Sequence, residues 1–94
     1  MKLPLKSGES LTAVMAASAA TTNPKVRFNW NDGGEPNVSH TSLNGNTAVT
    51  LLSGARERVR VIDELSIYNL DTAAVTVTLS HVQESTTHNV WKWA

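Results

Sequence analysis

Hydrophobic and polar residues alternate along several short stretches of this chain, with the period of two that is typical of β-strands. In residues 25–30, Val26, Phe28 and Trp30 share one face, and charged or polar residues occupy the other. Residues 75–80 alternate in the same way, but here threonine and serine form the polar face and no charge interrupts it. Each stretch therefore predicts a strand with one buried face.

Two glycine-containing dipeptides predict tight turns next to such strands. Asp32-Gly33 directly follows the first alternating stretch, and Asn44-Gly45 precedes a short apolar run at residues 47–52. Glycine tolerates the positive φ angles that hairpin turns require, so both dipeptides are strong turn signals. We expect a hairpin at the first position and a second turn at the other.

The alternation is interrupted within the longest predicted strand, residues 58–70. The pattern that Val59 and Val61 begin does not continue through Ile62 and beyond, so the register breaks near residues 62–64. A β-bulge, or a bend between two sheets, explains such a break.

Residues 11–20 fit two kinds of secondary structure. Leu11, Val14 and Met15 lie at helical spacing, and the alanines nearby favour a helix. Leu11, Ala13 and Met15 also satisfy the period of a strand. Because the rest of the chain is strand-like, we expect an extended segment here.

The chain is expected to fold as a single all-β domain. About six or seven strands, separated by turns every 8–12 residues, predict an antiparallel β-sandwich, and a jelly roll is the version that we prefer. The domain would span residues 1–94, with an extended N-terminal segment over roughly residues 1–23.

The size of the chain favours association. A domain of 94 residues buries only about 60–65% of the surface that its unfolded chain exposes, so contacts with copies or partners would stabilise it. There is no cysteine to form a disulfide. We therefore expect a homo-oligomer, either a dimer or a trimer.

Charge and hydropathy argue against two classes of partner. Eight basic residues balance eight acidic ones, whereas nucleic-acid binding needs a surplus of Lys and Arg. The apolar run at residues 11–20 is too short and too rich in Ala and Ser to span a membrane. Pro4, Gly8 and Glu9 interrupt the apolar region that a signal peptide would need. We predict no nucleic-acid partner, no membrane insertion and no secretion.

Candidate metal sites are weak. His81, Glu84 and His88 do not have the helical spacing of a zinc protease motif and lie in a predicted strand, turn and strand. Residues 29–35 offer oxygen ligands for calcium but lack the glycine and distal glutamate of a calcium loop. We predict no metal site and no cofactor.

No catalytic constellation stands out either. The chain lacks the Gly-x-Ser-x-Gly motif of a nucleophile elbow. The adjacent carboxylates Asp63 and Glu64 should point to opposite faces of a regular strand, which prevents them from acting as a pair. We predict that the protein is not an enzyme.

A row of arginines is one candidate for partner binding. In an extended chain, Arg56, Arg58 and Arg60 share one face, and Val59 and Val61 would then turn into the core. Guanidinium groups pair bidentately with carboxylates, so the row would suit an acidic surface on a partner. The alternative is a solvated beginning of a strand.

Two tryptophans near the end of the chain are a second candidate. Trp91 and Trp93 share one face of the predicted last strand, residues 89–93. They can be core residues, or they can contact a protein or a carbohydrate, because aromatic rings stack on sugars and anchor interfaces. With Trp30 and Tyr68, they also motivate the alternative of a carbohydrate- or receptor-binding module.

The hydroxyl-bearing face around Thr76 and Thr78 is the third candidate. A partner can cover a face of Thr, Ser and Val without desolvating an ion, and the hydroxyls can bond to its backbone. We therefore expect this face to take part in docking, although threonine also favours strands for conformational reasons alone.

Two long stretches resemble small structural proteins of tailed bacteriophages. "LKSGESLTAVMAASAATTNP" at residues 5–24 resembles the start of such proteins, and "VRVIDELSIYNLDTAAVTVTLSHV" at residues 59–82 is similar to their pattern of strand, Asn-x-Asp-Thr turn and Thr/Val strand. Proteins of this kind often continue after the equivalent of residues 90–93 into another strand.

The resemblance implies a component of the virion. It implies a capsid decoration or cement protein bound to the major capsid protein, with a tail or connector component as the alternative. Such a protein would be made in the cytoplasm of the bacterial host and would end up in the phage particle.

Overall fold

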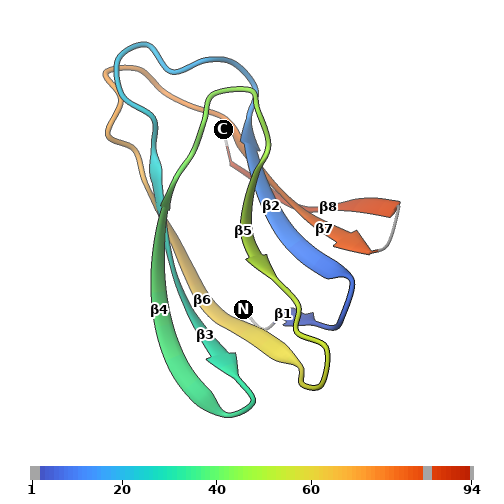
Figure 1. Cartoon of the computed structure of the whole chain (residues 1–94). Coiled ribbons are helices and arrows are strands. Elements are labelled where there is room, and N and C mark those ends of the chain that lie inside the picture. The colour runs from blue at the N-terminus through green and yellow to red at the C-terminus, as the bar shows by residue number, and fades with distance from the viewer. Residues whose placement is uncertain (1–2, 84–85, 94) are drawn as a thin grey trace.

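The computed structural model describes residues 3–83 and 86–93, and this part of the chain forms eight β-strands and no helix (Figure 1). The strands are β1 (Leu3–Leu5), β2 (Glu9–Met15), β3 (Lys25–Asp32), β4 (Glu35–Ser42), β5 (Val49–Ser53), β6 (Arg60–Tyr68), β7 (Val77–Gln83) and β8 (Thr86–Trp93). All strand pairs are antiparallel. The predicted all-β class is confirmed.

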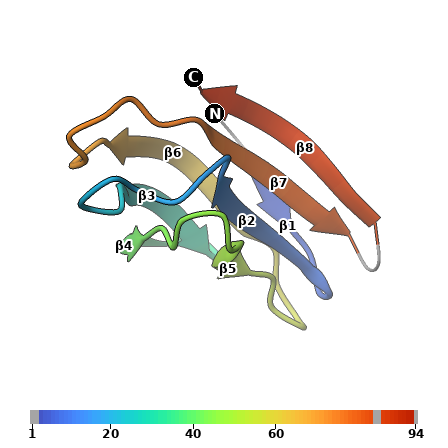
Figure 2. The same ribbon diagram turned by 90° about the horizontal axis from the view of Figure 1, so that it is seen from above.

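The strands form two four-stranded sheets that pack as a sandwich. In Figure 1, β4, β3 and β6 of the first sheet lie on the left and the second sheet lies on the right, and Figure 2 shows the same sheets from above. The first sheet has the order β1-β6-β3-β4, and the second sheet has the order β5-β2-β7-β8. Strands β4 and β8 lie at opposite flanks of the molecule. A jelly roll is not confirmed, because β1 pairs with β6 and β8 pairs with β7 rather than the first strand pairing with the last.

The core lies between the sheets and follows the alternation of the strands. In β2, Leu11, Ala13 and Met15 are buried, and the residues between them are partly exposed. The ambiguous N-terminal segment is therefore a strand as far as Met15, and the chain leaves the sheet after it. The fully buried large side chains from both sheets include Leu5, Leu11, Val26, Phe28, Ile62, Val77 and Leu79.

The predicted break in β6 is a β-bulge. Asn29 pairs with Glu64 and the next residue, Trp30, pairs with Ile62, so Asp63 is the extra residue. The bulge overturns the expected opposition of Asp63 and Glu64. The amides of Asn31 and Asn29, which share one face of β3, donate to Asp63 and Glu64 respectively. Both carboxylates therefore lie on the outer face of the first sheet.

Both predicted turns are present. Gly33 and Gly34 have φ angles of 64° and 95° and join β3 to β4 in a two-residue hairpin. Gly45 has a φ angle of 53°, and its turn is closed by a hydrogen bond of 2.9 Å from Thr47 N–H to the Asn44 carbonyl. This second turn carries the chain from the first sheet to the second.

Candidate functional site

The outer face of the second sheet carries hydroxyl, amide and valine side chains across all four strands. Cross-strand pairs place Thr12 beside Thr50 on one side and Ser80 on the other, and place Thr78 between Val14 and Lys92. These positions alternate with the buried residues of β2 and β7, so they point away from the core. We call this surface the neutral face; its described members are Ser10, Thr12, Val14, Thr50, Ser53, Thr78, Ser80, Val82, Thr87, Asn89 and Lys92.

Hydrogen bonds link part of the neutral face to itself. The Ser80 hydroxyl donates to Asn89 Oδ1 over 2.8 Å, and the Thr12 hydroxyl donates to the Ser80 carbonyl over 3.5 Å. Ser80 is only 6% exposed. Beside this pair, a bulge in β8 leaves a shallow hollow of about 280 Å³, lined by Thr78, Asn89, Val90 and Lys92. Lys92 is the single charged group among the named members of the face.

The outer face of the first sheet has a different character. Lys25 and Arg27 lie on it at one end of β3, and Asp63 and Glu64 lie on it further along the sheet. The outer face of the first sheet therefore carries more charged side chains than the neutral face does.

The two threonines singled out in the sequence have different positions. Thr78 lies in the middle of the neutral face, between β2 and β8. Thr76 precedes β7, and its carbonyl accepts the Ala16 N–H over 3.0 Å. Thr76 therefore lies at the margin of the face and lines a small hollow of about 190 Å³ between the loops that follow β2 and β6.

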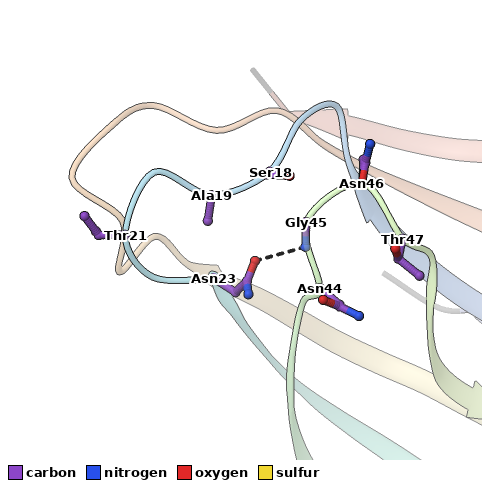
Figure 3. A pocket seen from close by; sticks show the side chains of 8 residues that line it. All are labelled: Ser18, Ala19, Thr21, Asn23, Asn44, Gly45, Asn46 and Thr47. Atoms are coloured by element: carbon purple, nitrogen blue, oxygen red, sulfur yellow. Dashed lines mark hydrogen bonds between the residues drawn. The ribbon is translucent and has the colours of Figure 1, made fainter.

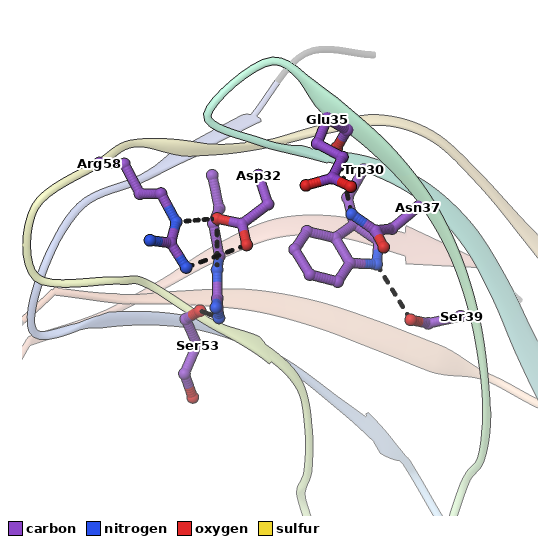
Figure 4. Close-up of polar contacts among 8 residues, drawn as sticks. Trp30, Asp32, Glu35, Asn37, Ser39, Ser53 and Arg58 are labelled. Carbon is purple, nitrogen blue, oxygen red and sulfur yellow. Dashed lines mark hydrogen bonds and ion pairs between the residues drawn. The ribbon is translucent and has the colours of Figure 1, made fainter.

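The arginine row is not a continuous surface, because two of its members pair with an acid of the same chain (Figure 4). Arg58 bonds to both oxygens of Asp32, and Arg60 Nε lies 3.3 Å from Asp32 Oδ1. The guanidinium of Arg58 holds the pKa of the Asp32 carboxyl below its usual range, with a further contribution from Arg60. Arg56 lies in the loop before β6 and lines a shallow hollow with Lys6, Ser7 and Arg58.

The parity predicted for this segment is wrong, because β6 begins at Arg60 and the preceding residues form a loop. Val59 is 43% exposed rather than buried. Val61 pairs with Asn31, on the outer face. Arg60 instead turns inward: its guanidinium lies 5.2 Å from the ring centre of Trp30 and donates to the Ser53 carbonyl over 2.9 Å. The prediction assumed an extended chain from Arg56 onward, but the strand begins only at Arg60.

A buried carboxylate closes one end of the second sheet, and no local sequence signal marked it. Glu9 is 9% exposed and accepts hydrogen bonds from the Lys6 N–H and Gln83 Nε2, each over 3.0 Å. His81 Nε2 lies 3.3 Å from the same carboxylate. These donors, the Lys6 N–H first among them, hold the pKa of Glu9 below its usual range.

The candidate metal ligands are not gathered around a common point. His81 and His88 have ring centres 6.3 Å apart, His81 contacts Glu9, and Glu84 lies outside the described residues. In the loop at residues 29–35, both oxygens of Asp32 are bound by arginine. Within residues 3–83 and 86–93, no group of three or more His, Asp or Glu side chains is placed to hold a metal ion.

A carboxylate at the opposite end of the sandwich organises the loop that follows β2. Asp71 accepts the N–H groups of Ala20, Thr21 and Thr22 over 2.9, 2.8 and 3.3 Å, and also that of Thr72 over 2.8 Å. These backbone donors, with that of Ala20 as the largest, hold the pKa of Asp71 far below its usual range.

The loop held by Asp71 forms a polar hollow with the turn after β4 (Figure 3). Asn23 Oδ1 accepts the Gly45 N–H over 3.0 Å and joins the two walls. The hollow measures about 370 Å³, and its lining, which carries no charged group, consists of Ser18, Ala19, Thr21, Asn23, Asn44, Gly45, Asn46 and Thr47.

The C-terminal tryptophans are placed by their backbone alone. Trp91 pairs with Leu79, and Trp93 pairs with Val77. The side chains of both tryptophans lie outside the described part of the structure, so the predicted contact is not tested.

Comparison of the chain with models of protein families, with curated proteins and with solved structures gave no match. In the part of the chain that the structure describes, no helix has the length and apolar character needed to cross a bilayer.

Proposed function

We propose that this chain is a non-enzymatic structural protein of a tailed-bacteriophage particle, which docks onto another virion protein through the neutral face. The extent of that face carries the proposal. Hydroxyl, amide and valine side chains run across β5, β2, β7 and β8, with Lys92 as the one charge among the described members. A partner can cover such a face without removing several ions from water.

The resemblance of residues 5–24 and 59–82 to phage structural proteins supports a place in the virion. Among virion sites, we propose the assembled head, where the chain would act as a decoration or cement protein on the major capsid protein. A tail or connector position would use the same face and the same chemistry.

The surroundings of three carboxylates support a structural role for these groups. Glu9, Asp32 and Asp71 each accept several hydrogen bonds, and their pKa values are lowered. A general acid or base works best with a pKa near the working pH, so these carboxylates are adapted to hold structure rather than to transfer protons.

Mass spectrometry of purified particles of the phage that encodes the chain tests this proposal. We expect the protein in the particles, with a copy number close to that of the major capsid protein. A few copies per particle would instead favour a tail or connector position. Absence from purified particles would refute a virion role.

The second candidate is a carbohydrate- or receptor-binding module, which the polar hollow beside Asn23 favours. Neutral hydroxyl and amide groups line that hollow, and Tyr68 is 50% exposed elsewhere on the molecule. Trp30 does not serve as an open platform, because Arg60 covers its ring and its Nε1 donates to Ser39 over 3.0 Å. Glycan titration followed by tryptophan fluorescence and by NMR shifts at Asn23 and Gly45 tests this function; unchanged spectra would exclude it for the glycans used.

A further inference from the structure

The four edge strands of the sandwich differ in how well they are protected against pairing with another strand. Three edges carry features that natural sheets use to prevent such pairing. β1 has three residues and contains Pro4, β5 has five residues and a register shift against β2, and β8 has a bulge and Lys92. These edges are short, irregular or charged.

The fourth edge, β4, lacks these features over most of its length. It has eight residues and pairs with β3 without any shift of register. Pro36 lies next to the hairpin turn, and residues 37–42 contain no proline, lysine or bulge. Val38, at its centre, is 54% exposed. No other described strand pairs with the open side of β4.

The hairpin geometry determines which amides of β4 reach that open side. Asp32 and Glu35 flank the two-residue turn and so form a hydrogen-bonded pair. Hydrogen-bonded pairs then alternate along the ladder, so the N–H groups of Val38, His40 and Ser42 point away from β3. Pro36 belongs to the same set of positions, whose N–H groups are not needed for pairing with β3, so the missing N–H of proline costs no hydrogen bond there.

We propose that β4 is a self-association edge, through which two copies of the chain pair antiparallel over residues 38–42 and join their first sheets into one continuous sheet. Centring the pairing on His40 places Val38 opposite Ser42 of the second copy. Every outward N–H in this stretch then meets a carbonyl, and Pro36 stays outside the paired stretch.

A second copy fits this edge better than a head-to-tail chain of copies does. Head-to-tail assembly would require β4 to pair with a different edge, and the other three edges carry protective features. Pairing β4 with itself about a two-fold axis uses the one open edge and closes at a dimer.

The charged residues of the outer face lie one or two strands in from this edge. Lys25 and Arg27 lie on β3, and Asp63 and Glu64 lie on β6. Pairing centred on His40 separates the Arg27 residues of the two copies by three strand spacings, about 14 Å. This separation exceeds the Debye length of about 8 Å at physiological ionic strength, so charge repulsion does not oppose the pairing.

Sedimentation equilibrium of the full chain, with two variants at one position, tests the proposal. Val38→Pro removes one outward N–H while leaving the ladder to β3 intact, and Val38→Ala removes the side chain while keeping the N–H. We expect the wild type and Val38→Ala to form dimers and Val38→Pro to dimerise at least about tenfold more weakly. A chain that stays monomeric up to about 1 mM, or a dimer that Val38→Pro leaves unchanged, would overturn the proposal.

Amide hydrogen exchange of the wild type gives a second measurement that does not depend on the folding of a variant. In the dimer, the amides of Val38, His40 and Ser42 should exchange slowly and lose protection on dilution. The amides of Ser39 and Thr41 should be protected at every concentration, because they bond to β3. Fast exchange at the first three positions in a dimeric sample would show that another surface forms the dimer.

Discussion

The two outer faces of the sandwich are built on the same core but differ in charge. The outer face of the first sheet carries Lys25, Arg27, Asp63 and Glu64, whereas the neutral face of the second sheet carries one charge among its described members. The net charge of the chain, which is zero, does not reveal that the two faces differ in their number of charged side chains. The charged side chains of the first face are stabilised by contact with water. The neutral face, in contrast, can be covered by another protein at little electrostatic cost.

The largest expected effect comes from placing a charge in the centre of the neutral face. Thr12→Glu should weaken association with the particle about 100-fold, because Thr12 lies between Thr50 and Ser80 with no cation opposite it, and leaving a buried carboxylate unpaired costs about 3 kcal/mol. Quantitative binding of purified variants to particles stripped of the protein measures this effect.

Ser66→Glu is the matched control for that variant, because Ser66 pairs with Arg27 on the outer face of the first sheet and is partly exposed as Thr12 is. Its affinity should change by less than about twofold. Equal losses for the two variants would mean that the two faces do not differ in function.

The next effect concerns the charges at the end of the sandwich. Asp32→Asn removes the carboxylate shared by Arg58 and Arg60, so two cations would lie close together beside Trp30. We expect a clearly lower urea midpoint at pH 7 and a smaller loss in 1 M salt, which screens their repulsion by shortening the Debye length to about 3 Å. An unchanged midpoint at low salt would show that the ion pairs do not stabilise the fold.

Acid should affect the fold before it affects the neutral face. The folded pKa values of Glu9, Asp32 and Asp71 are depressed, so their stabilisation is present above the unfolded values of about 4 and is lost as the pH falls through the folded ones. We expect stability to be nearly constant from about pH 8 to 5 and to fall below about pH 4. Urea titrations across this range measure it.

Asp71→Asn measures how much of the acid dependence of stability comes from the carboxylate that holds the loop after β2. The variant keeps the size of the side chain but loses the charge that accepts four backbone N–H groups. It should be less stable at pH 7 and should show a shallower acid dependence. An acid dependence as steep as that of the wild type would assign the effect to other carboxylates.

The smallest effect is expected from the remaining arginine of the row. Arg56→Gln should change the free energy of unfolding by less than about 0.5 kcal/mol, because Arg56 is an exposed loop residue. Binding to particles should also stay within about twofold between 50 mM and 500 mM salt if the neutral face forms the contact. A steep salt dependence that Arg56→Gln removes would restore Arg56 as a partner-binding residue.

The parts of the fold that could be predicted from sequence were those with strong local signals. Strand β3 alternates cleanly, Gly33 fits a positive φ, and the interrupted pattern near Ile62 marks the bulge. By contrast, β4 has Val38 as its one large apolar residue and is held by pairing with β3. In the sequence, β4 is indicated mainly by the Gly33-Gly34 turn, because a tight hairpin turn after β3 requires a second strand to follow it.

The candidate site could be predicted only in part, because it depends on contacts between distant strands. Thr78 was visible in the sequence, but the neutral face exists because β2 pairs with β7 in a register that no local pattern determines. Glu9 is buried by Gln83 and His81, more than seventy positions away. Asp32 was expected in a turn, and its pairing with Arg58 and Arg60 arises from the fold.

Cysteine labelling on the assembled particle tests the central claim most directly, and the absence of native cysteine makes it clean. Thr78→Cys and Ser66→Cys place one thiol on each outer face, and maleimide labelling is timed on free protein and on particles. The neutral-face account predicts that the particle slows labelling of Thr78→Cys at least about tenfold and leaves Ser66→Cys nearly unchanged. Thr78→Cys labelling equally fast in both states, or protection of Ser66→Cys instead, would contradict it.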